Sequence, residues 1–323
     1  MKKQTGWLLA LVAAFLGCAD DSDNANEQAE QLLLEQQQTI EQYIADNGIT
    51  ATRDGDIYYQ TITANTSGEV PQSGDIIKIY YQIAELEGGV IDEVLASSSK
   101  PPVTYVFQTG NLILPAMDFS IAKMRVGEEY EFYLPTSYAY VGYTLEGVVP
   151  ENAIIRTRIQ LVDIVTEAEV RAEEDLQIKD YLSENMLTEA DSLTSGVYYV
   201  LTEEGEAEGP TPADGSTVQV RYTGTLLDGT EFDSNVDADN PLSFVIGAEQ
   251  VIDGFDIGVS QMQLGEKGII IIPSLEAYAQ SQLAFPSEII LDLFQRGLIN
   301  SPIGAEIPPF SPLRFDIELV KVD

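Results

Sequence analysis

The side chains available in this sequence exclude the common covalent mechanisms and favour an apolar pocket. The chain has 323 residues, no histidine and one cysteine, Cys18. A Ser-His-Asp triad and a Cys–His pair are therefore excluded. Separate segments instead contribute aromatic and aliphatic side chains with a carboxylate and a phenol among them: Tyr222, Phe232, Asp233, Phe255, Tyr278 and Ile307. Together these residue types predict a lined pocket.

The elements that must position these side chains follow from residue periodicity. Residues 218–222 alternate between apolar and polar, which predicts a strand with one buried face. Asp228-Gly229 suits a tight hairpin turn into a second strand. Phe255, Val259 and Met262 recur with helical spacing and predict a short helix with one apolar side.

Five motifs in this half of the chain resemble those of the FKBP-type peptidyl-prolyl isomerases. They are Y-T-G-x-L-x-D-G-x-x-F-D-S, Q-V-I-x-G-F-D-x-G-V-x-x-M-x-x-G-E-K, A-Y, I-P-P and L-x-F-D-I-E-L, and together they cover most of residues 197–323 in the family's order. The resemblance implies an α+β fold in which a twisted antiparallel sheet wraps around a short helix. It also implies that the activity is isomerisation of Xaa-Pro peptide bonds in proline-containing polypeptides, without a cofactor.

The resemblance assigns a role to each matching residue. Phe255 would form the floor beneath the prolyl ring, and the Ile252 backbone N–H and Tyr278 hydroxyl would donate to substrate carbonyls. Asp233 would orient that network or interact with the carbonyl carbon. The pocket walls would be Tyr222, Phe232, Val251, Ile252 and Phe315, with further substrate contacts from Leu242, Phe244 and Ile307. Leu242 replaces an aromatic residue and Glu306 an aliphatic one, which puts the substrate preference in doubt.

An apolar pocket is chemically sufficient for this reaction. Rotation about the amide bond has a barrier of about 18–20 kcal/mol because resonance stiffens the C–N bond. No covalent bond breaks, so no nucleophile is required. The twisted transition state has lost resonance and its carbonyl is less polarised, so a dry pocket shaped for that form lowers the barrier.

The first half of the chain repeats the plan of the second. Ile40, Tyr43, Met124, Gly127, Pro135 and Tyr140 recur 138 residues later as Ile178, Tyr181, Met262, Gly265, Pro273 and Tyr278. We predict two FKBP-like domains, residues 32–166 and 190–323, each with a helical lead-in, joined by a helical linker over residues 167–189.

The two predicted domains differ at the pocket. The first keeps its polar groups, with Tyr81, Asp92 and Tyr140 aligned on Tyr222, Asp233 and Tyr278. Its aromatic residues are lost: Ile91, Met117 and Thr157 stand where the second has Phe232, Phe255 and Phe315, and Val149-Pro150-Glu151 replaces Ile307-Pro308-Pro309. We expect the first domain to fold, since Ile and Met still fill a core, but to be a poor isomerase.

An insertion over residues 279–306 lengthens a loop that is short in the family. Ser287 is a candidate cap for a helix from Glu288 to Arg296 that Gly297 ends. Its apolar side would consist of Ile289, Ile290, Leu293 and Phe294, with Leu298 just beyond. Such a segment can be a flap on its own domain or an element that docks on a partner.

The N-terminus predicts export and lipid anchoring. Lys2 and Lys3 precede the apolar run 6–16, which is too short to span a bilayer and is typical of a signal peptide over residues 1–17. It ends at Cys18 in a sequence typical of a bacterial lipoprotein cleavage site, although an ordinary secretory signal is the alternative. Residues 18–31 are acidic and rich in Asn and Gln, and predict a flexible tether.

Charge limits the partners that can be expected. With 16 basic and 53 acidic residues the formal net charge is −37, so the phosphate backbone of a nucleic acid would be repelled. The acidic runs at residues 20–23 and 237–239 lack the spacing of a calcium loop, and we expect no metal site. The sequence thus predicts a lipid-anchored folding catalyst of the bacterial cell envelope, most simply at the outer membrane on its periplasmic or surface face. The alternative is a non-catalytic chaperone or an accessory subunit of an outer-membrane assembly.

Overall fold

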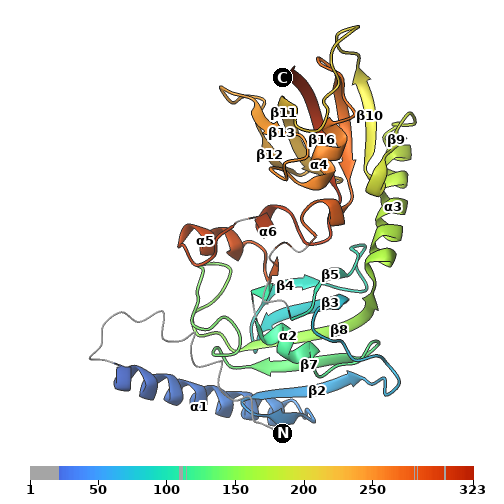
Figure 1. The fold of residues 1–323 in the computed structure, drawn as a ribbon. Helices are drawn as coiled ribbons and strands as arrows, with labels where there is room; N and C mark the ends of the chain where they lie inside the picture. The colour runs from blue at the N-terminus through green and yellow to red at the C-terminus, as the bar shows by residue number, and fades with distance from the viewer. Residues whose placement is uncertain (1–21, 109–111, 114, 280, 282, 302) are drawn as a thin grey trace. The chain divides into compact units, whose positions relative to one another are not determined.

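The computed structural model describes residues 22–108, 112–113, 115–279, 281, 283–301 and 303–323 (Figure 1). Two compact units make up the chain, the first mainly from residues up to Ile164 and the second mainly from Val165 to Asp323. Cys18 and the predicted signal peptide lie outside the described residues. None of the helices among the described residues is both long and apolar enough to cross a membrane.

The described residues of the first repeat form strands and two α-helices. Its elements are α1 (Ser22–Asp46), β1 (Thr52–Asp54), β2 (Ile57–Thr63), β3 (Ile76–Glu85), β4 (Val90–Val94), β5 (Val103–Val106), β6 (Leu112–Ile113), α2 (Pro115–Ile121), β7 (Glu129–Leu134) and β8 (Ile155–Val165). The main sheet runs in the order β1-β2-β7-β8-β3-β4. Strand β1 pairs antiparallel with β2, β2 with β7, β7 with β8, and β3 with β4.

The second repeat contains the corresponding elements plus those of the insertion. They are α3 (Glu167–Glu184), β9 (Asp191–Ser192), β10 (Tyr198–Glu203), β11 (Thr217–Leu226), β12 (Glu231–Ser234), β13 (Leu242–Val245), α4 (Asp253–Val259), β14 (Lys267–Ile272), β15 (Leu283–Ala284), α5 (Ile289–Gln295), α6 (Ile303–Glu306) and β16 (Leu313–Val322). The sheet order is β9-β10-β14-β16-β11-β12, with β13 also paired to β11.

The two sheets therefore have the same strand order, element for element. β1, β2, β7, β8, β3 and β4 of the first correspond to β9, β10, β14, β16, β11 and β12 of the second. Helix α2 lies between β5 and β7 in the chain as α4 lies between β13 and β14, and α1 and α3 precede β1 and β9. The prediction of an α+β fold with two antiparallel sheets is confirmed.

Helix α1 begins earlier than the sequence suggested. It starts at Ser22, so residues 22–31, which we predicted as part of a flexible tether, are helical instead. The acidic and amide side chains that indicated disorder are compatible with an exposed helix surface. The C-terminal end is as predicted: Gly48 has φ +62°, and the Ile49 N–H donates to the Ile44 carbonyl at 2.9 Å.

Helix α3 has a sharply defined N-terminus. Thr166 and Glu169 form a capping box, in which the Thr166 side chain accepts from the Glu169 N–H and the Glu169 carboxylate accepts from the Thr166 N–H. The helix therefore begins at Glu167 and runs without interruption to Glu184. Its buried Ile178 and Leu182 pack on Tyr198 and Val200 of β10 and on the outward side chains of β14.

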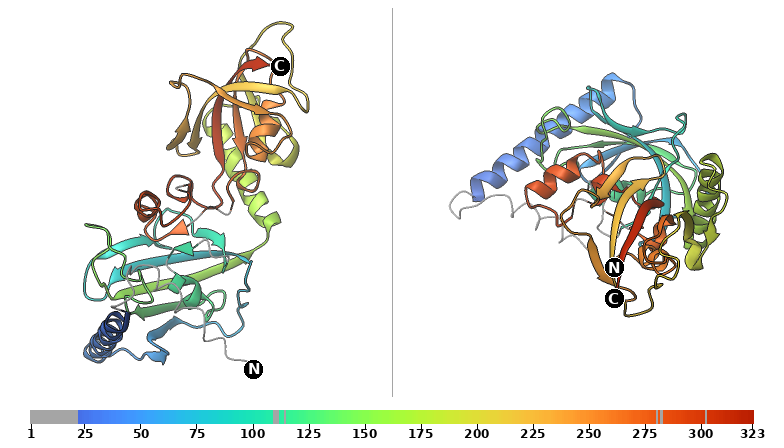
Figure 2. Two further views of the ribbon diagram at one scale, coloured as in Figure 1. Left: turned by 60° about the vertical axis from the view of Figure 1, so that its left-hand side comes forward. Right: turned by 90° about the horizontal axis from the view of Figure 1, so that it is seen from above.

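Strand β14 is covered on both faces, which explains its unbroken apolar sequence. Ile269 and Ile271 face helix α3, whereas Ile270 and Ile272 face the other way into the core that contains α4. Two glycines let α4 lie this close: a Cβ on Gly254 would meet Ile272 Cγ2 at 2.1 Å, and one on Gly258 would meet Ile270 Cδ1 at 2.4 Å. Figure 2 shows α4 against the sheet of its own unit in both views.

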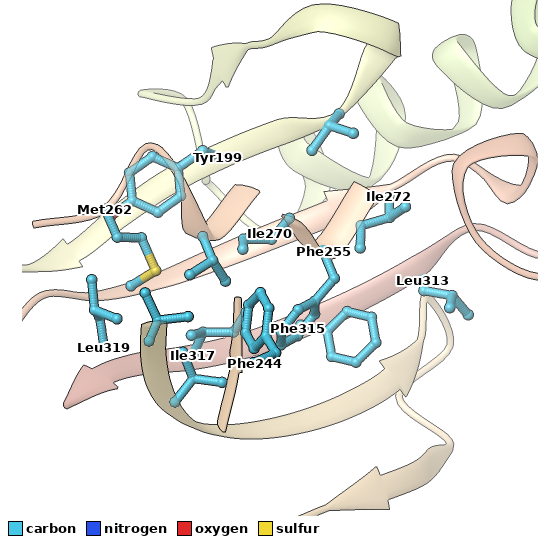
Figure 3. Packing of buried hydrophobic residues seen from close by; sticks show 14 of the residues in the cluster. Tyr199, Phe244, Phe255, Met262, Ile270, Ile272, Leu313, Phe315, Ile317 and Leu319 are labelled. Atoms are coloured by element: carbon cyan, nitrogen blue, oxygen red, sulfur yellow. The ribbon is translucent and has the colours of Figure 1, made fainter. Parts of the chain in front are cut away.

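The core on the α4 side holds the predicted apolar side of the helix. Phe255, Val259 and Met262 are all buried, as expected from their spacing, although Met262 lies in the turn after the helix. They pack with Val218 and Val220 of β11 and with alternate residues of β16 (Figure 3). The sheet and the short helix thus bring the candidate pocket residues to one side of the second unit.

The insertion is helical where predicted, but two details of the prediction are wrong. Ser287 does not cap the helix, because α5 begins at Ile289 after Glu288, whose αR backbone has no side-chain cap. Phe294 is 41% exposed and lies outside the buried set, which contains Ile289, Ile290 and Leu293. Gly297, with φ +71°, ends the helix as predicted. Ile303 of α6 packs against the core that contains α4, so part of the insertion is anchored on its own domain.

Candidate active site

Four aromatic rings meet edge to face at the candidate pocket. Phe255 and Phe315 are closest, with ring centroids 5.0 Å apart and planes at 79°. Tyr222 lies 5.6 Å from Phe255 and 5.8 Å from Phe315. Phe232 lies 5.6 Å from Phe315 at 84°. Edge-to-face contact is the arrangement that aromatic quadrupoles favour, so these rings hold one another in fixed orientations.

The close approach of two of these rings depends on a glycine. A Cβ on Gly224 of β11 would lie 2.7 Å from the Phe232 ring and 2.9 Å from the Phe315 ring. Gly224 pairs with Phe315 on one neighbouring strand and with Asp233 on the other. Any larger residue there would push the two rings apart.

The polar part of the site is a short hydrogen bond between a phenol and a carboxylate. The Tyr222 hydroxyl donates to Asp233 Oδ2 at 2.5 Å. Burial, followed by this hydrogen bond and the charge of Asp233, raises the pKa of Tyr222 above its ordinary value. Tyr222 therefore remains a neutral donor, and Asp233 is held in one orientation beside the rings.

Asn235 fixes the strand that carries Tyr222, a role that sequence reasoning missed. Its Oδ1 accepts from the Tyr222 N–H at 2.7 Å, and its Nδ2 donates to the Val220 carbonyl at 3.0 Å. Arg221 Nη1 donates to the Asn235 carbonyl at 3.0 Å and holds the same loop. The signal was an Asn directly after the D-S of the first motif, at the end of a strand.

Two donors are free to meet a substrate carbonyl. Among the described residues the Tyr278 hydroxyl has no hydrogen-bond acceptor, and burial together with the charge of Asp233 raises its pKa. Ile252 precedes α4 in an extended conformation, and its carbonyl accepts from the Phe255 N–H at 3.0 Å. Its own N–H is bonded to no described residue. Both residues are partly buried against the core.

The remaining candidate residues lie around the same core. Phe244 is buried, with its ring 5.8 Å from Phe255, and Ile307 is buried near the end of the insertion (Figure 3 shows Phe244 beside Phe255 and Phe315). Val251 and Leu242 pack against the cluster but are partly exposed. The structure thus places the residues proposed for the pocket of the second domain around one core, with Asp233 bonded to Tyr222.

The equivalent region of the first unit keeps the polar pair and loses the aromatic rings. The Tyr81 hydroxyl donates to Asp92 Oδ2 at 2.7 Å. Met117 and Thr157, at the positions of Phe255 and Phe315, are fully buried. The Thr157 hydroxyl has no hydrogen-bond partner among the described residues, and neither has that of Ser120, which stands where the second unit has Gly258.

The sequence matches a known protein family. Residues 68–162 and 209–320 match the family model for the FKBP-type peptidyl-prolyl cis-trans isomerase. Over 112 residues the chain is 40% identical to FK506-binding protein 1 of Saccharomyces cerevisiae, an alignment that covers 35% of this chain and 81% of that protein. It is 39% identical over 112 residues to peptidyl-prolyl cis-trans isomerase Fkbp12 of Drosophila melanogaster, covering 35% of this chain and 85% of that protein.

A solved structure of three FKBP domains of wheat FKBP73 is also similar. At 22% identity it covers 85% of this chain and 99% of that chain, with a TM-score of 0.33. The stretches matched to the family model make up more than half of the chain. The chain therefore belongs to the family of FKBP-type peptidyl-prolyl cis-trans isomerases.

Proposed function

We propose that the second unit carries the isomerase activity and acts on proline-containing polypeptides. The observation that supports this proposal is the cluster of four edge-to-face rings, Tyr222, Phe232, Phe255 and Phe315, beside a Tyr222–Asp233 hydrogen bond. Such a cluster offers a prolyl ring an apolar floor and walls. The Tyr278 hydroxyl and the Ile252 N–H, which have no partner among the described residues, would hold the carbonyls on either side of the twisting bond.

The catalytic advantage comes from preferring the twisted amide. Because its carbonyl is less polarised, the twisted form loses less on entering an apolar site than the planar substrate does. The donors fix the flanking chain so that rotation is confined to one bond. Asp233 accepts the Tyr222 hydrogen bond, which fixes its carboxylate beside the aromatic rings.

Measuring the two units separately tests this assignment. Residues 165–323 should accelerate cis–trans exchange of a short Xaa-Pro peptide, and residues 22–164 should be far slower. We also expect residues 165–323 to bind FK506, the ligand named in the yeast relative, and to be inhibited by it. Equal rates for the two units would contradict the proposal.

We further propose that the chain is lipid-anchored through Cys18 at the bacterial cell envelope. Support comes from the sequence: a basic start, an apolar run at 6–16, and a single cysteine followed by acidic residues. Labelled fatty acid should be incorporated into the wild-type chain and not into Cys18→Ala. Incorporation into both would rule out this attachment.

The insertion supports a second candidate function, docking on an outer-membrane protein assembly. Leu291, Phe294 and Leu298 are each more than 40% exposed, within eight residues of one another. Apolar side chains gathered in this way are typical of binding surfaces. If the insertion docks on membrane partners, deleting residues 280–304 should abolish co-purification with them. If the insertion covers the pocket, the deletion should change peptide turnover. Replacing the three side chains by Ser, without deletion, controls for disturbance of the loop.

A further inference from the structure

Helix α3 contacts the turn that precedes Tyr278 through a buried carboxylate. Glu174 is 5% exposed, and its Oε2 accepts from the Ser274 backbone N–H at 2.8 Å. Its Oε1 accepts from the Ser274 hydroxyl, and Ser274 is itself fully buried. A carboxylate is costly to bury unless its oxygens are hydrogen-bonded, and here both are. The pair therefore fixes the position of Ser274 against α3.

A second contact ties the other end of the same turn to α3. Arg171, one turn before Glu174, has its Nη2 2.9 Å from Glu276 Oε1. Between the two contacts, Ser274–Glu276 form a single helical turn that the Ala277 N–H closes onto the Ser274 carbonyl at 2.9 Å. Tyr278 is the next residue. The lead-in helix thus holds the turn from which the Tyr278 side chain projects toward the core.

The first repeat contains the same contact with different chemistry. Gln36 of α1, 138 residues before Glu174, is buried, and its Oε1 accepts from the Thr136 N–H at 2.9 Å. Its Nε2 donates to the Asn152 carbonyl at 2.8 Å. Each lead-in helix therefore supplies an acceptor to the backbone N–H that follows the proline of its repeat. The recurrence shows that an amide can provide this acceptor as well as a carboxylate.

These contacts lie partly outside the stretch of this chain that matches the family model. The second family match spans residues 209–320, which includes Ser274 and Tyr278 but not α3. We propose that Glu174 is a positioning residue for the isomerase site, because it holds the Ser274–Glu276 turn and thereby the orientation of the Tyr278 hydroxyl. This proposal rests on the proposed function of the second unit. On this basis α3 belongs to the catalytic unit and is more than a connection between repeats.

The test uses the full chain and a double-mutant cycle. Glu174→Ala should lower kcat/KM on a short Xaa-Pro peptide severalfold, at a temperature well below the unfolding of the variant. Glu174→Gln should recover most of that loss, since the amide can accept from the Ser274 N–H as Gln36 does from Thr136. Glu173→Ala, an exposed neighbour on the same helix, is the matched control and should behave as wild type.

The cycle separates positioning from general stability. In the Tyr278→Phe background, Glu174→Ala should have little further effect, because the hydroxyl that it orients is already absent. An equal fold-loss in both backgrounds would overturn the proposal and reduce Glu174 to a structural residue. If Glu174→Ala does not fold, Ser274→Ala replaces it in the cycle, since it removes the hydroxyl donor and retains the backbone bond.

Amide hydrogen exchange gives a readout that does not depend on catalysis. Exchange at residues 274–278 should accelerate in Glu174→Ala and return toward the wild-type rate in Glu174→Gln. Unchanged exchange there would overturn the proposal. An inactive wild-type chain with the expected exchange pattern would contradict the proposed function but leave the restraint of this turn by α3 intact.

Discussion

The two units hold a tyrosine hydroxyl on an aspartate in nearly the same way, yet they surround that pair with different side chains. The oxygens are 2.7 Å apart for Tyr81 and Asp92, and 2.5 Å apart for Tyr222 and Asp233. Beside the second pair lie Phe255 and Phe315; beside the first, the equivalent positions carry Met117 and Thr157. All four of these neighbouring side chains are buried.

This difference separates the requirements of the fold from those of the site. Met117 fills the core as completely as Phe255, so strand order and helix position are preserved with either. A prolyl site needs more, namely rigid aromatic faces. Thr157 supplies no aromatic face. It is also unfavourable in the core, because its buried hydroxyl has no hydrogen-bond partner among the described residues. The first unit has retained the scaffold and the polar pair while its apolar surface has changed.

The largest expected effect comes from truncating Phe255, the proposed floor of the pocket in the second unit. Met117 occupies the equivalent position in the first unit and serves as the comparison. In the full chain, Phe255→Ala should lower kcat/KM on a Xaa-Pro peptide about 100-fold, which corresponds to ~2.7 kcal/mol of transition-state stabilisation. Met117→Ala should change it less than about twofold. Phe255→Leu retains more of the side-chain volume, so it shows whether the loss in Phe255→Ala is caused by unfolding. Similar losses from the two alanine variants would mean that both units are active.

A smaller effect is expected at the two equivalent tyrosines. Tyr278→Phe removes a donor to a substrate carbonyl and should cost about 1 kcal/mol, or severalfold in kcat/KM. The ring still packs, so the midpoint of thermal unfolding should barely move. Tyr140→Phe is the matched control in the first unit and should leave peptide turnover unchanged. A fully active Tyr278→Phe chain would limit Tyr278 to packing.

Most of the fold could be predicted because several kinds of signal agreed. Alternation in residues 218–222, the turn at Asp228-Gly229 and the helical spacing of Phe255, Val259 and Met262 all correspond to observed elements. Repetition at a constant spacing then extended the prediction to the first unit, where motif evidence was weaker. Residue types at the pocket identified which side chains would converge.

What the sequence did not predict depends on contacts between distant residues. Glu174 and Ser274 are 100 residues apart, and a Glu in an acidic helix gives no sign that it is buried. The start of α1 at Ser22 was missed because polar composition alone cannot distinguish an exposed helix from a tether. The Ser287 cap was wrong because a capping residue requires an extended backbone, which composition does not specify.

A third prediction concerns the stability of the first unit. Thr157→Val replaces a buried, unpartnered hydroxyl with a methyl group of similar size, so the unfolding free energy should rise by about 1 kcal/mol. Urea unfolding of residues 22–164 measures this change. Thr61→Val, at an exposed position in β2, should stay within about 0.5 kcal/mol of wild type. A destabilised Thr157→Val would indicate that the hydroxyl is satisfied in solution.

The smallest effect should be a pH dependence that distinguishes Glu174 from Gln36. Burial raises the pKa of Glu174 in the folded state, against the opposing effects of its Ser274 hydrogen bonds and of Arg171. The negative charge of Glu173 raises the pKa of Glu174 further. The carboxylate of Glu276, on the turn that Glu174 contacts, is paired with Arg171. The folded state therefore keeps a proton on Glu174 to higher pH than the unfolded state does, so this contribution to stability is present at low pH and lost as pH rises through the folded pKa.

Glu174→Gln cannot ionise and should lack this dependence. The stability of wild type relative to Glu174→Gln should therefore fall as pH rises above about 4, near the ordinary pKa of a glutamate. Urea unfolding of residues 165–323 at a series of pH values measures the difference. The reciprocal variant, Gln36→Glu in residues 22–164, should acquire a slope of the same sign, because it places an ionisable group in the equivalent buried position. Parallel pH profiles for Glu174→Gln and wild type would show that Glu174 does not titrate differently in the folded and unfolded states.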